Sequence, residues 1–142
     1  GQYDFLVKLD SILKNHPKPI PLEYRINVYE QLYRINPNRV EVCFNLGVLY
    51  FKEKKEVNKS LKYLQRAAKL NPKNPDVQKL LGVVYGRISR FDKAVTHFEQ
   101  AALLNPKDAN VFKNLAITYQ QLGNTEKAQI NMQRYNILRQ KK

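Results

Sequence analysis

The sequence is poor in residues that build disulfides, metal centres and phosphate-binding loops. It has a single cysteine, Cys43, which excludes an intramolecular disulfide and a cysteine-based metal site. Its five glycines form neither a phosphate loop nor a dinucleotide fingerprint. The two histidines, His16 and His97, have no acidic or cysteine partner at ligand spacing, so solvated or structural roles are favoured. We therefore expect no enzyme activity, no metal and no cofactor.

Long apolar runs are also missing. No unbroken apolar stretch approaches the roughly 18 residues of a membrane helix, and "GQYDFLVKLD" lacks a basic start followed by an apolar stretch. We expect a soluble protein without membrane insertion, with a cytoplasmic location favoured. Because residue 1 is Gly rather than Met, a targeting segment removed from the chain stays an open alternative.

Negative charge is scarce as well. Twelve acidic residues stand against 25 Lys and Arg, which gives a formal net charge of +13. Such a balance favours acidic partners and speeds association at low salt. Hydrophobic residues nevertheless make up 43% of the chain, enough for a core, so wholesale disorder is not expected.

What the sequence does contain is a period. Asn-Pro pairs place Pro37, Pro72 and Pro106 at separations of 35 and 34 residues. A second landmark recurs with them as "NLGVLY", "LLGVVY" and "NLAITY", which end at Tyr50, Tyr85 and Tyr119. A repeat of this length is typical of stacked helical units that share one core.

Each unit is predicted to be a pair of helices. Apolar residues recur three and four positions apart over 41–53, 75–88 and 109–122, and again over 57–70, 91–104 and 125–139. Asn-Pro ends the second helix because proline disfavours helical geometry in the residue before it. Between the helices, Gly123 suits a left-handed cap, and Asn124 or Thr125 can cap the helix that follows.

Residues 1–37 are less regular. Helical spacing over 3–15 is interrupted by "HPKPIP", a stiff extended connector, and resumes in "LEYRINVYEQLYRINP". We interpret this region as a degenerate N-terminal hairpin or cap. Residues 38–142 then hold three repeats, at about 40–72, 75–106 and 109–140. The alternative is that helix 3–15 belongs to an upstream element.

The middle unit carries a specific resemblance. Its "LLGVVY", Ala94, Phe98, Ala101 and Pro106 match the pattern of the tetratricopeptide repeat family, which the chain resembles from Val40 to about Gln140. Three departures are visible. The family's tryptophan position holds Cys43, Gln78 and Phe112, "KEKKEV" has one extra residue, and Gln140 replaces the last proline. The resemblance implies an all-α fold, a right-handed superhelical solenoid of about four antiparallel helix pairs, eight helices in all.

The resemblance also implies where a partner would bind. In this family the first helix of each unit lines the concave face, and ligand peptides usually lie along it. The corresponding residues would form a groove that is apolar along its centre with Lys and Arg at intervals, and they are Phe44, Asn45, Val48, Lys52, Lys79, Leu80, Val83, Arg87, Lys113, Asn114, Ile117 and Gln121. Such a surface suits a peptide with apolar side chains and some carboxylates.

Two features of the chain have competing interpretations, the asparagines of this groove and the basic stretch 51–69. Asn45 and Asn114 occupy equivalent places, where an amide can bond a ligand backbone, but solvated helix asparagines are an equally good interpretation. The groove lacks the Lys and Arg set of members that grip a C-terminal carboxylate, which disfavours a chaperone-tail clamp. The basic stretch 51–69 is best interpreted as a solvated outer face, with an acidic docking patch or a nucleic-acid contact as the alternative.

The leading hypothesis is a protein–protein interaction scaffold or adaptor that binds a partner peptide or helix, with some acidic residues, in the concave groove. A short peptide would bind such a preformed groove with an affinity on the order of micromolar. Two alternatives stay open. One is binding of single-stranded RNA or another polyanion to the basic surface. The other is self-assembly into a homo-oligomer through the ends of the solenoid.

Overall fold

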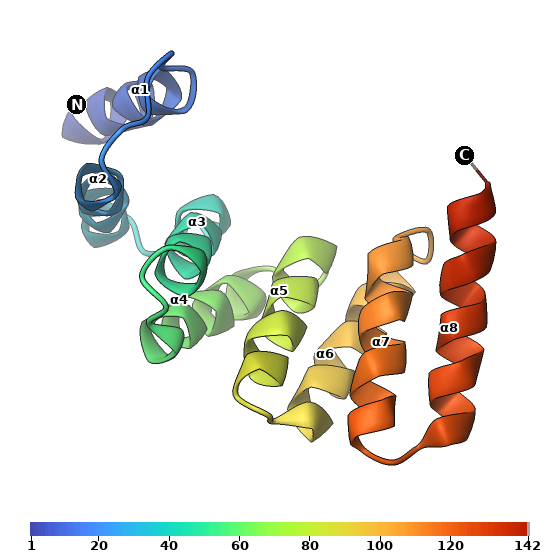
Figure 1. Cartoon of the computed structure of the whole chain (residues 1–142). Helices are drawn as coiled ribbons and strands as arrows, with labels where there is room; N and C mark the ends of the chain where they lie inside the picture. The colour runs from blue at the N-terminus through green and yellow to red at the C-terminus, as the bar shows by residue number, and fades with distance from the viewer. Residues whose placement is uncertain (142) are drawn as a thin grey trace. The chain divides into compact units, whose positions relative to one another are not determined.

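The computed structural model describes residues 1–141, without the side chain of Leu13. Within them the chain forms eight helices: α1 (Gln2–Lys14), α2 (Leu22–Ile35), α3 (Val40–Lys52), α4 (Val57–Leu70), α5 (Pro75–Arg87), α6 (Phe91–Leu104), α7 (Ala109–Gln121) and α8 (Thr125–Gln140) (Figure 1). No strand occurs in this part of the chain. The prediction of an all-α chain with eight helices is confirmed.

The helices belong to two compact units. The first, Gly1–Leu70, holds α1 to α4, and the second, Asn71–Lys142, holds α5 to α8. Within the units, α3 packs on α4, α5 on α6 and α7 on α8, each pair joined by a short turn (Figure 1). The right-handed superhelix and the separation of residues 1–37 from three repeats stay predictions.

The Asn-Pro turns share one local structure. The side-chain oxygens of Asn36, Asn71 and Asn105 each accept a hydrogen bond from the backbone N–H two residues later, at 3.0, 3.2 and 3.3 Å. Asparagine closes such a turn with its own side chain, and the proline that follows it cannot continue the helix. The repeated dipeptide therefore both ends one helix and directs the chain into the next.

The turn inside each hairpin uses a left-handed residue. Gly123 has φ of 76°, as predicted, and Lys55 and Ser89 adopt φ of 56° and 58° at the equivalent positions. The next residue donates its backbone N–H to a tyrosine carbonyl, from Arg90 to Tyr85 and from Asn124 to Tyr119, both at 2.9 Å. In the first regular unit the corresponding bond spans one more residue, from Glu56 to Tyr50 at 2.8 Å. The extra residue of "KEKKEV" is therefore absorbed by a wider turn.

Small residues allow the two helices of a hairpin to approach closely. A Cβ atom added at Gly47 would lie 2.5 Å from Leu64, and one at Gly82 would lie 2.6 Å from the ring of Phe98. Ser60 is fully buried and donates a hydrogen bond to the carbonyl of Gly47 at 2.7 Å. Leu64 and Phe98 stand four residues after the small residues Ser60 and Ala94, and they fill the space over Gly47 and Gly82.

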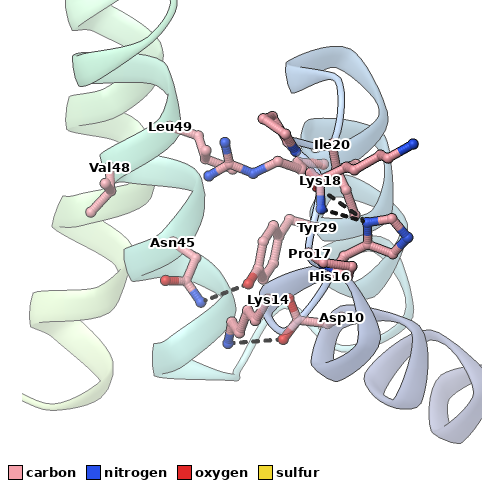
Figure 2. Close-up of a pocket in the computed structure, with 12 residues that line it drawn as sticks. Asp10, Lys14, His16, Pro17, Lys18, Ile20, Tyr29, Asn45, Val48 and Leu49 are labelled. Carbon is pink, nitrogen blue, oxygen red and sulfur yellow. Dashed lines mark hydrogen bonds and ion pairs between the residues drawn. The ribbon is translucent and has the colours of Figure 1, made fainter.

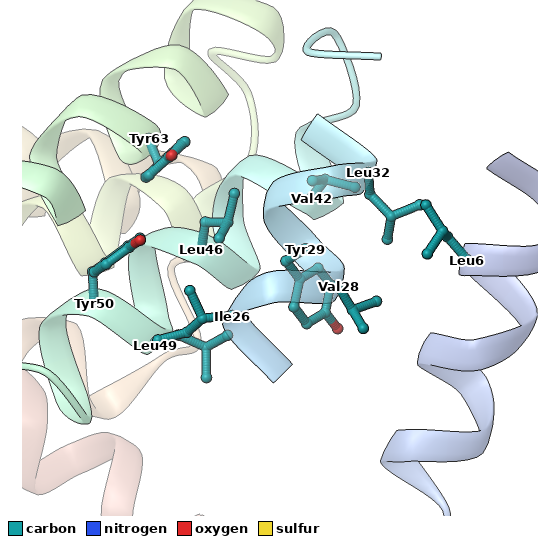
Figure 3. Close-up of a cluster of buried hydrophobic side chains, with 10 residues drawn as sticks. All are labelled: Leu6, Ile26, Val28, Tyr29, Leu32, Val42, Leu46, Leu49, Tyr50 and Tyr63. Atoms are coloured by element: carbon teal, nitrogen blue, oxygen red, sulfur yellow. The ribbon is translucent and has the colours of Figure 1, made fainter. Parts of the chain in front are cut away.

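A continuous apolar cluster joins all four helices of the first unit (Figure 3). It contains Leu6 of α1, Leu32 of α2, Leu46 of α3 and Tyr63 of α4, with Leu46 fully buried. Tyr63 also stacks on Tyr50 with ring centroids 5.7 Å apart. This cluster attaches the irregular first hairpin to the first regular repeat, so burial of apolar surface holds α1 and α2 in place.

The repeated tyrosines link one hairpin to the preceding helix. Tyr50 donates a hydrogen bond to Glu30 of α2, and Tyr119 donates one to Glu99 of α6. The ammonium groups of Lys59 and Lys127 lie 5.1 and 5.2 Å from the centres of the same two rings. Tyr50 and Tyr119 therefore each combine a buried ring, a charge-assisted hydrogen bond and a cation over the ring.

The Tyr119 contact predicts a dependence of stability on alkaline pH. Burial, together with the hydrogen bond to Glu99, raises the pKa of Tyr119 to about 12. An unfolded tyrosine loses its proton at about pH 10. Between this pH and the folded pKa the folded chain holds more protons than the unfolded chain, so its stability falls as the pH rises. At about pH 8 we expect Tyr119→Phe to be less stable by about 1 kcal/mol, and the difference should shrink towards about pH 12. Urea unfolding of the variant and the unchanged chain from about pH 8 to about pH 12 measures this difference in stability. A difference that stays constant over this pH range would contradict the raised pKa of Tyr119.

Candidate interaction site

The first unit contains a cavity with a volume of about 510 Å³ (Figure 2). It is formed by α1, the connector between α1 and α2, α2 and the middle of α3. Its lining residues are Asp10, Lys14, His16, Pro17, Lys18, Pro19, Ile20, Arg25, Tyr29, Asn45, Val48 and Leu49. The wall is thus partly apolar and partly charged, with Asp10 beside the cations Lys14, Lys18 and Arg25.

One side of the cavity is closed by a polar network. Asn45 donates a hydrogen bond to the Tyr29 hydroxyl at 3.2 Å, and Lys14 forms an ion pair with Asp10 at 2.9 Å (Figure 2). Lys14 also pairs with Glu41 at 3.1 Å. Burial and the nearby Asp10 raise the pKa of Tyr29. Although burial opposes its charge, hydrogen bonds to Asp10 and Glu41 raise the pKa of Lys14. Lys14 therefore stays charged and already has its partners.

The connector forms the other side. His16 accepts the backbone N–H of Lys18 at its Nδ1 atom, 3.2 Å away, which holds the turn between Pro17 and Pro19. Within the described residues, Lys18 and Arg25 form no ion pair, unlike Lys14. Both cations belong to the cavity lining, so they are the groups there that are available to an acidic ligand.

The structure brings two of the predicted groove residues into this cavity, Asn45 and Val48. The carbonyl oxygen of the Asn45 amide forms no hydrogen bond within the described residues, although its NH₂ group binds Tyr29. Phe44 is half-buried and Lys52 is exposed on the same helix, and neither lines the cavity. The predicted residues of the first unit therefore divide into two that meet in a cavity and two that do not.

The predicted residues of the second unit have varied surroundings. The ammonium group of Lys79 pairs with Asp108 at 2.7 Å, which offsets its charge. Leu80 is buried, Val83 and Asn114 are half-buried, and Arg87 and Lys113 are exposed. Ile117 and Gln121 line a smaller cavity of about 320 Å³ with Met132 of α8. Whether any of these residues contacts a partner stays a prediction.

Sequence reasoning missed the contribution of the connector. The pattern of "HPKPIP" predicts only a stiff connector, yet His16, Lys18 and Ile20 all line the larger cavity. Arg25 was not singled out either. The sequence contains one signal for this part of the cavity, a run of prolines with an embedded lysine directly before an amphipathic helix. Prolines stiffen the backbone, so the lysine between them is held in place.

Metal-binding clusters, membrane spans and the environments of Cys43 and His97 complete the description of the residues that the structure describes. No group of three or more His, Cys, Asp or Glu side chains is placed to hold a metal ion there. None of the described helices is long and apolar enough to cross a membrane. Cys43 is fully buried, and burial raises the pKa of its thiol, which disfavours the reactive thiolate. Burial and then the charge of Lys93 lower the pKa of His97.

Comparison with known sequences agrees with the repeat geometry. One profile of the tetratricopeptide repeat matches residues 40–74 and 80–108, and another matches 97–130. The chain belongs to the tetratricopeptide repeat family, whose members are typically non-enzymatic scaffolds for protein–protein interaction. A search of curated proteins found no match.

The chain is also similar to solved structures of the protein MamA. A structure of MamA AMB-1 superposes with a TM-score of 0.84 at 26% identity, over 99% of this chain and 74% of that one. A structure of MamA MSR-1 gives a TM-score of 0.76 at 26% identity, over 92% and 72% of the two chains. A further MamA crystal structure superposes with a TM-score of 0.87 at 21% identity, over 98% of this chain and 79% of that one. At this identity the likeness shows the fold alone.

Proposed function

We propose that this scaffold binds a segment of a partner protein in the cavity between α1, the connector, α2 and α3. The segment would place an apolar side chain against Val48 and Leu49 and a carboxylate beside Lys18 and Arg25. The observation that carries the proposal is the composition of this cavity. Two groove residues inferred from the repeat pattern line it, together with two cations that have no ion-pair partner among the described residues.

The build of the cavity supports this role. Its polar wall is held by the Asn45–Tyr29 hydrogen bond and the ion pairs of Lys14, and its connector is stiffened by Pro17, Pro19 and Pro21. A surface that is ordered before binding loses little conformational entropy when the ligand arrives. Affinity is then set by a few well-placed contacts, and a short peptide binds on the order of micromolar.

A labelled octapeptide of alternating Glu and Leu tests the proposal. We expect the double variant Arg25→Glu with Val48→Gln to weaken its binding by about tenfold or more, because one change repels the carboxylates and the other removes apolar contact. Fluorescence anisotropy at about 50 and 150 mM salt gives the dissociation constants. A peptide with Gln in place of Glu reports how much of the binding depends on charge.

The matched control carries the same two chemical changes outside the cavity. Arg34→Glu with Val7→Gln lies in the same unit, and neither residue lines the cavity. Binding by this control should change by less than about threefold. Equal losses in the two double variants would show that net charge alone attracts the peptide and would refute the cavity assignment.

The same samples test the alternatives. Labelled octauridylate that binds more tightly than the peptide, with a steep loss on added salt, would favour a nucleic-acid function. Light scattering across protein concentrations would reveal self-association. Self-association has one specific observation in its favour. The terminal helices carry large apolar side chains that are strongly exposed to solvent: Phe5 by 65%, Ile12 by 59%, Ile130 by 56% and Ile137 by 47%.

A further inference from the structure

The last hairpin carries a cluster of cations that lie over aromatic rings. The guanidinium of Arg134 lies 5.7 Å from the centre of the Phe112 ring, and that of Arg139 lies 5.3 Å from the centre of the Tyr135 ring. The ammonium of Lys113 lies 5.8 Å from the same Tyr135 ring. Three cations from α7 and α8 therefore gather around two rings, and we call these five residues the α7–α8 cluster.

These cations have no acidic partner among the described residues, which they share with most Lys and Arg of the chain but not with a few lysines. Lys79, Lys54 and Lys59 are paired with Asp108, Glu23 and Glu56. Within residues 1–141, no acidic side chain forms an ion pair with any cation of the α7–α8 cluster, and Lys113, Arg134 and Arg139 are exposed. The rings that hold them are half-buried. The positive charge of the cluster is thus left for an external anion.

Stacking also prepares the two arginines for recognition. A guanidinium beside a ring contacts it through the π-system and keeps most of its five N–H donors for other partners. Arg139 has in addition a long contact of 3.4 Å from Nη1 to the Tyr135 hydroxyl. Side chains restrained in this way lose less entropy when they bind a carboxylate in the two-bond geometry typical of arginine.

We propose that the α7–α8 cluster is a second docking site, which binds an acidic segment of a partner protein through Lys113, Arg134 and Arg139. An acidic segment fits better than RNA because the cations already occupy ring faces that bases would need for stacking. The site lies on other residues than the cavity of the first unit, so either site can exist without the other. Together they would make the scaffold bivalent toward partners with acidic segments.

Binding of labelled octaglutamate, which has no apolar side chains, tests the proposal by fluorescence anisotropy at about 50 mM salt. The triple variant Lys113→Gln, Arg134→Gln, Arg139→Gln is expected to bind at least about tenfold more weakly than the unchanged chain. The control Lys73→Gln, Arg90→Gln, Lys107→Gln removes three positive charges from exposed positions of the same unit. The affinity of this control for octaglutamate should fall by less than about threefold. Equal losses of affinity in the two triple variants would overturn the proposal.

A second variant separates stacked geometry from charge. Arg134→Lys with Arg139→Lys keeps the net charge but replaces two planar forks with point charges, so octaglutamate binding should fall by about threefold or more. Full retention would overturn the role of the stacked guanidinium groups. Tighter binding of octauridylate, lost in the triple glutamine variant, would overturn the choice of an acidic segment. The Arg25→Glu, Val48→Gln variant should keep this binding within about threefold, so failure here and failure of the cavity proposal are distinguishable.

Discussion

Replacing Phe98 with alanine is expected to lower the free energy of unfolding by about 3–5 kcal/mol. The ring is 3% exposed and fills the space over Gly82, where three of its carbon atoms lie within 2.9 Å of an added Cβ position. Alanine would leave a cavity between α5 and α6 that their backbones cannot close, and the loss of apolar burial adds to the cost. Urea unfolding followed by the helical circular dichroism signal measures the effect.

The repeat supplies a control for this substitution. Met132 stands at the position equivalent to Phe98, 34 residues later, but it is 37% exposed. Met132→Ala should therefore cost only about 1 kcal/mol or less. Losses of equal size at the two positions would show that burial does not set the cost of truncation within this repeat.

Replacing Gly82 with alanine is expected to lower the free energy of unfolding by about 1–3 kcal/mol, although alanine favours a helix more than glycine does. The added methyl would lie 2.6 Å from the Cδ1 and Cε1 atoms of Phe98, far inside contact distance. An aromatic ring is rigid, so relief of this overlap requires α5 and α6 to separate. Urea unfolding of the variant gives the change directly.

Gly86 provides the matched substitution on the same helix. A Cβ added at Gly86 would meet nothing within 4 Å, and its φ is not in the left-handed region. Gly86→Ala should therefore raise the free energy of unfolding by about 0.5–1 kcal/mol through helix propensity. The two changes are chemically identical and four residues apart. Effects of the same sign would contradict the close packing described for Gly82.

The helix pattern could be predicted closely from the sequence. The ranges 57–70 and 91–104 coincide with α4 and α6, and the other predicted ranges of the regular repeats differ from the structure by about one residue at an end. The reason is that the start and end signals are local: Asn71 and Asn105 close their turns with their own side chains, and Asn74 and Asp108 cap the next helices. Such signals act over a few residues and can be seen without knowing the fold.

The left-handed turns could be predicted only in part. Gly123 was identified because glycine adopts a positive φ without strain, whereas Lys55 and Ser89 take the same conformation at a steric cost. That cost is met by packing of the two helices on either side of the turn. The preference of the single residue does not contain this information.

The candidate site shows the same limit. The resemblance to the repeat family predicts that Asn45 and Val48 face a binding groove, and the structure shows only that both line the cavity of the first unit. The pairing of Lys79 with Asp108 joins residues 29 positions apart, and nothing in the local pattern indicates it. That Lys18, Arg25 and the three cations of the α7–α8 cluster have no ion-pair partner among the described residues likewise becomes visible only when the ion pairs are known.

The sequence by itself determined the number of helices, their ends and the repeat family, because helix periodicity, proline and side-chain caps act within a few residues of the chain. Only the tertiary structure decided which charges are neutralised, which cavity forms and where cations stack on rings. Those features depend on distances between side chains that are far apart in sequence, and such distances are set by how the helices pack.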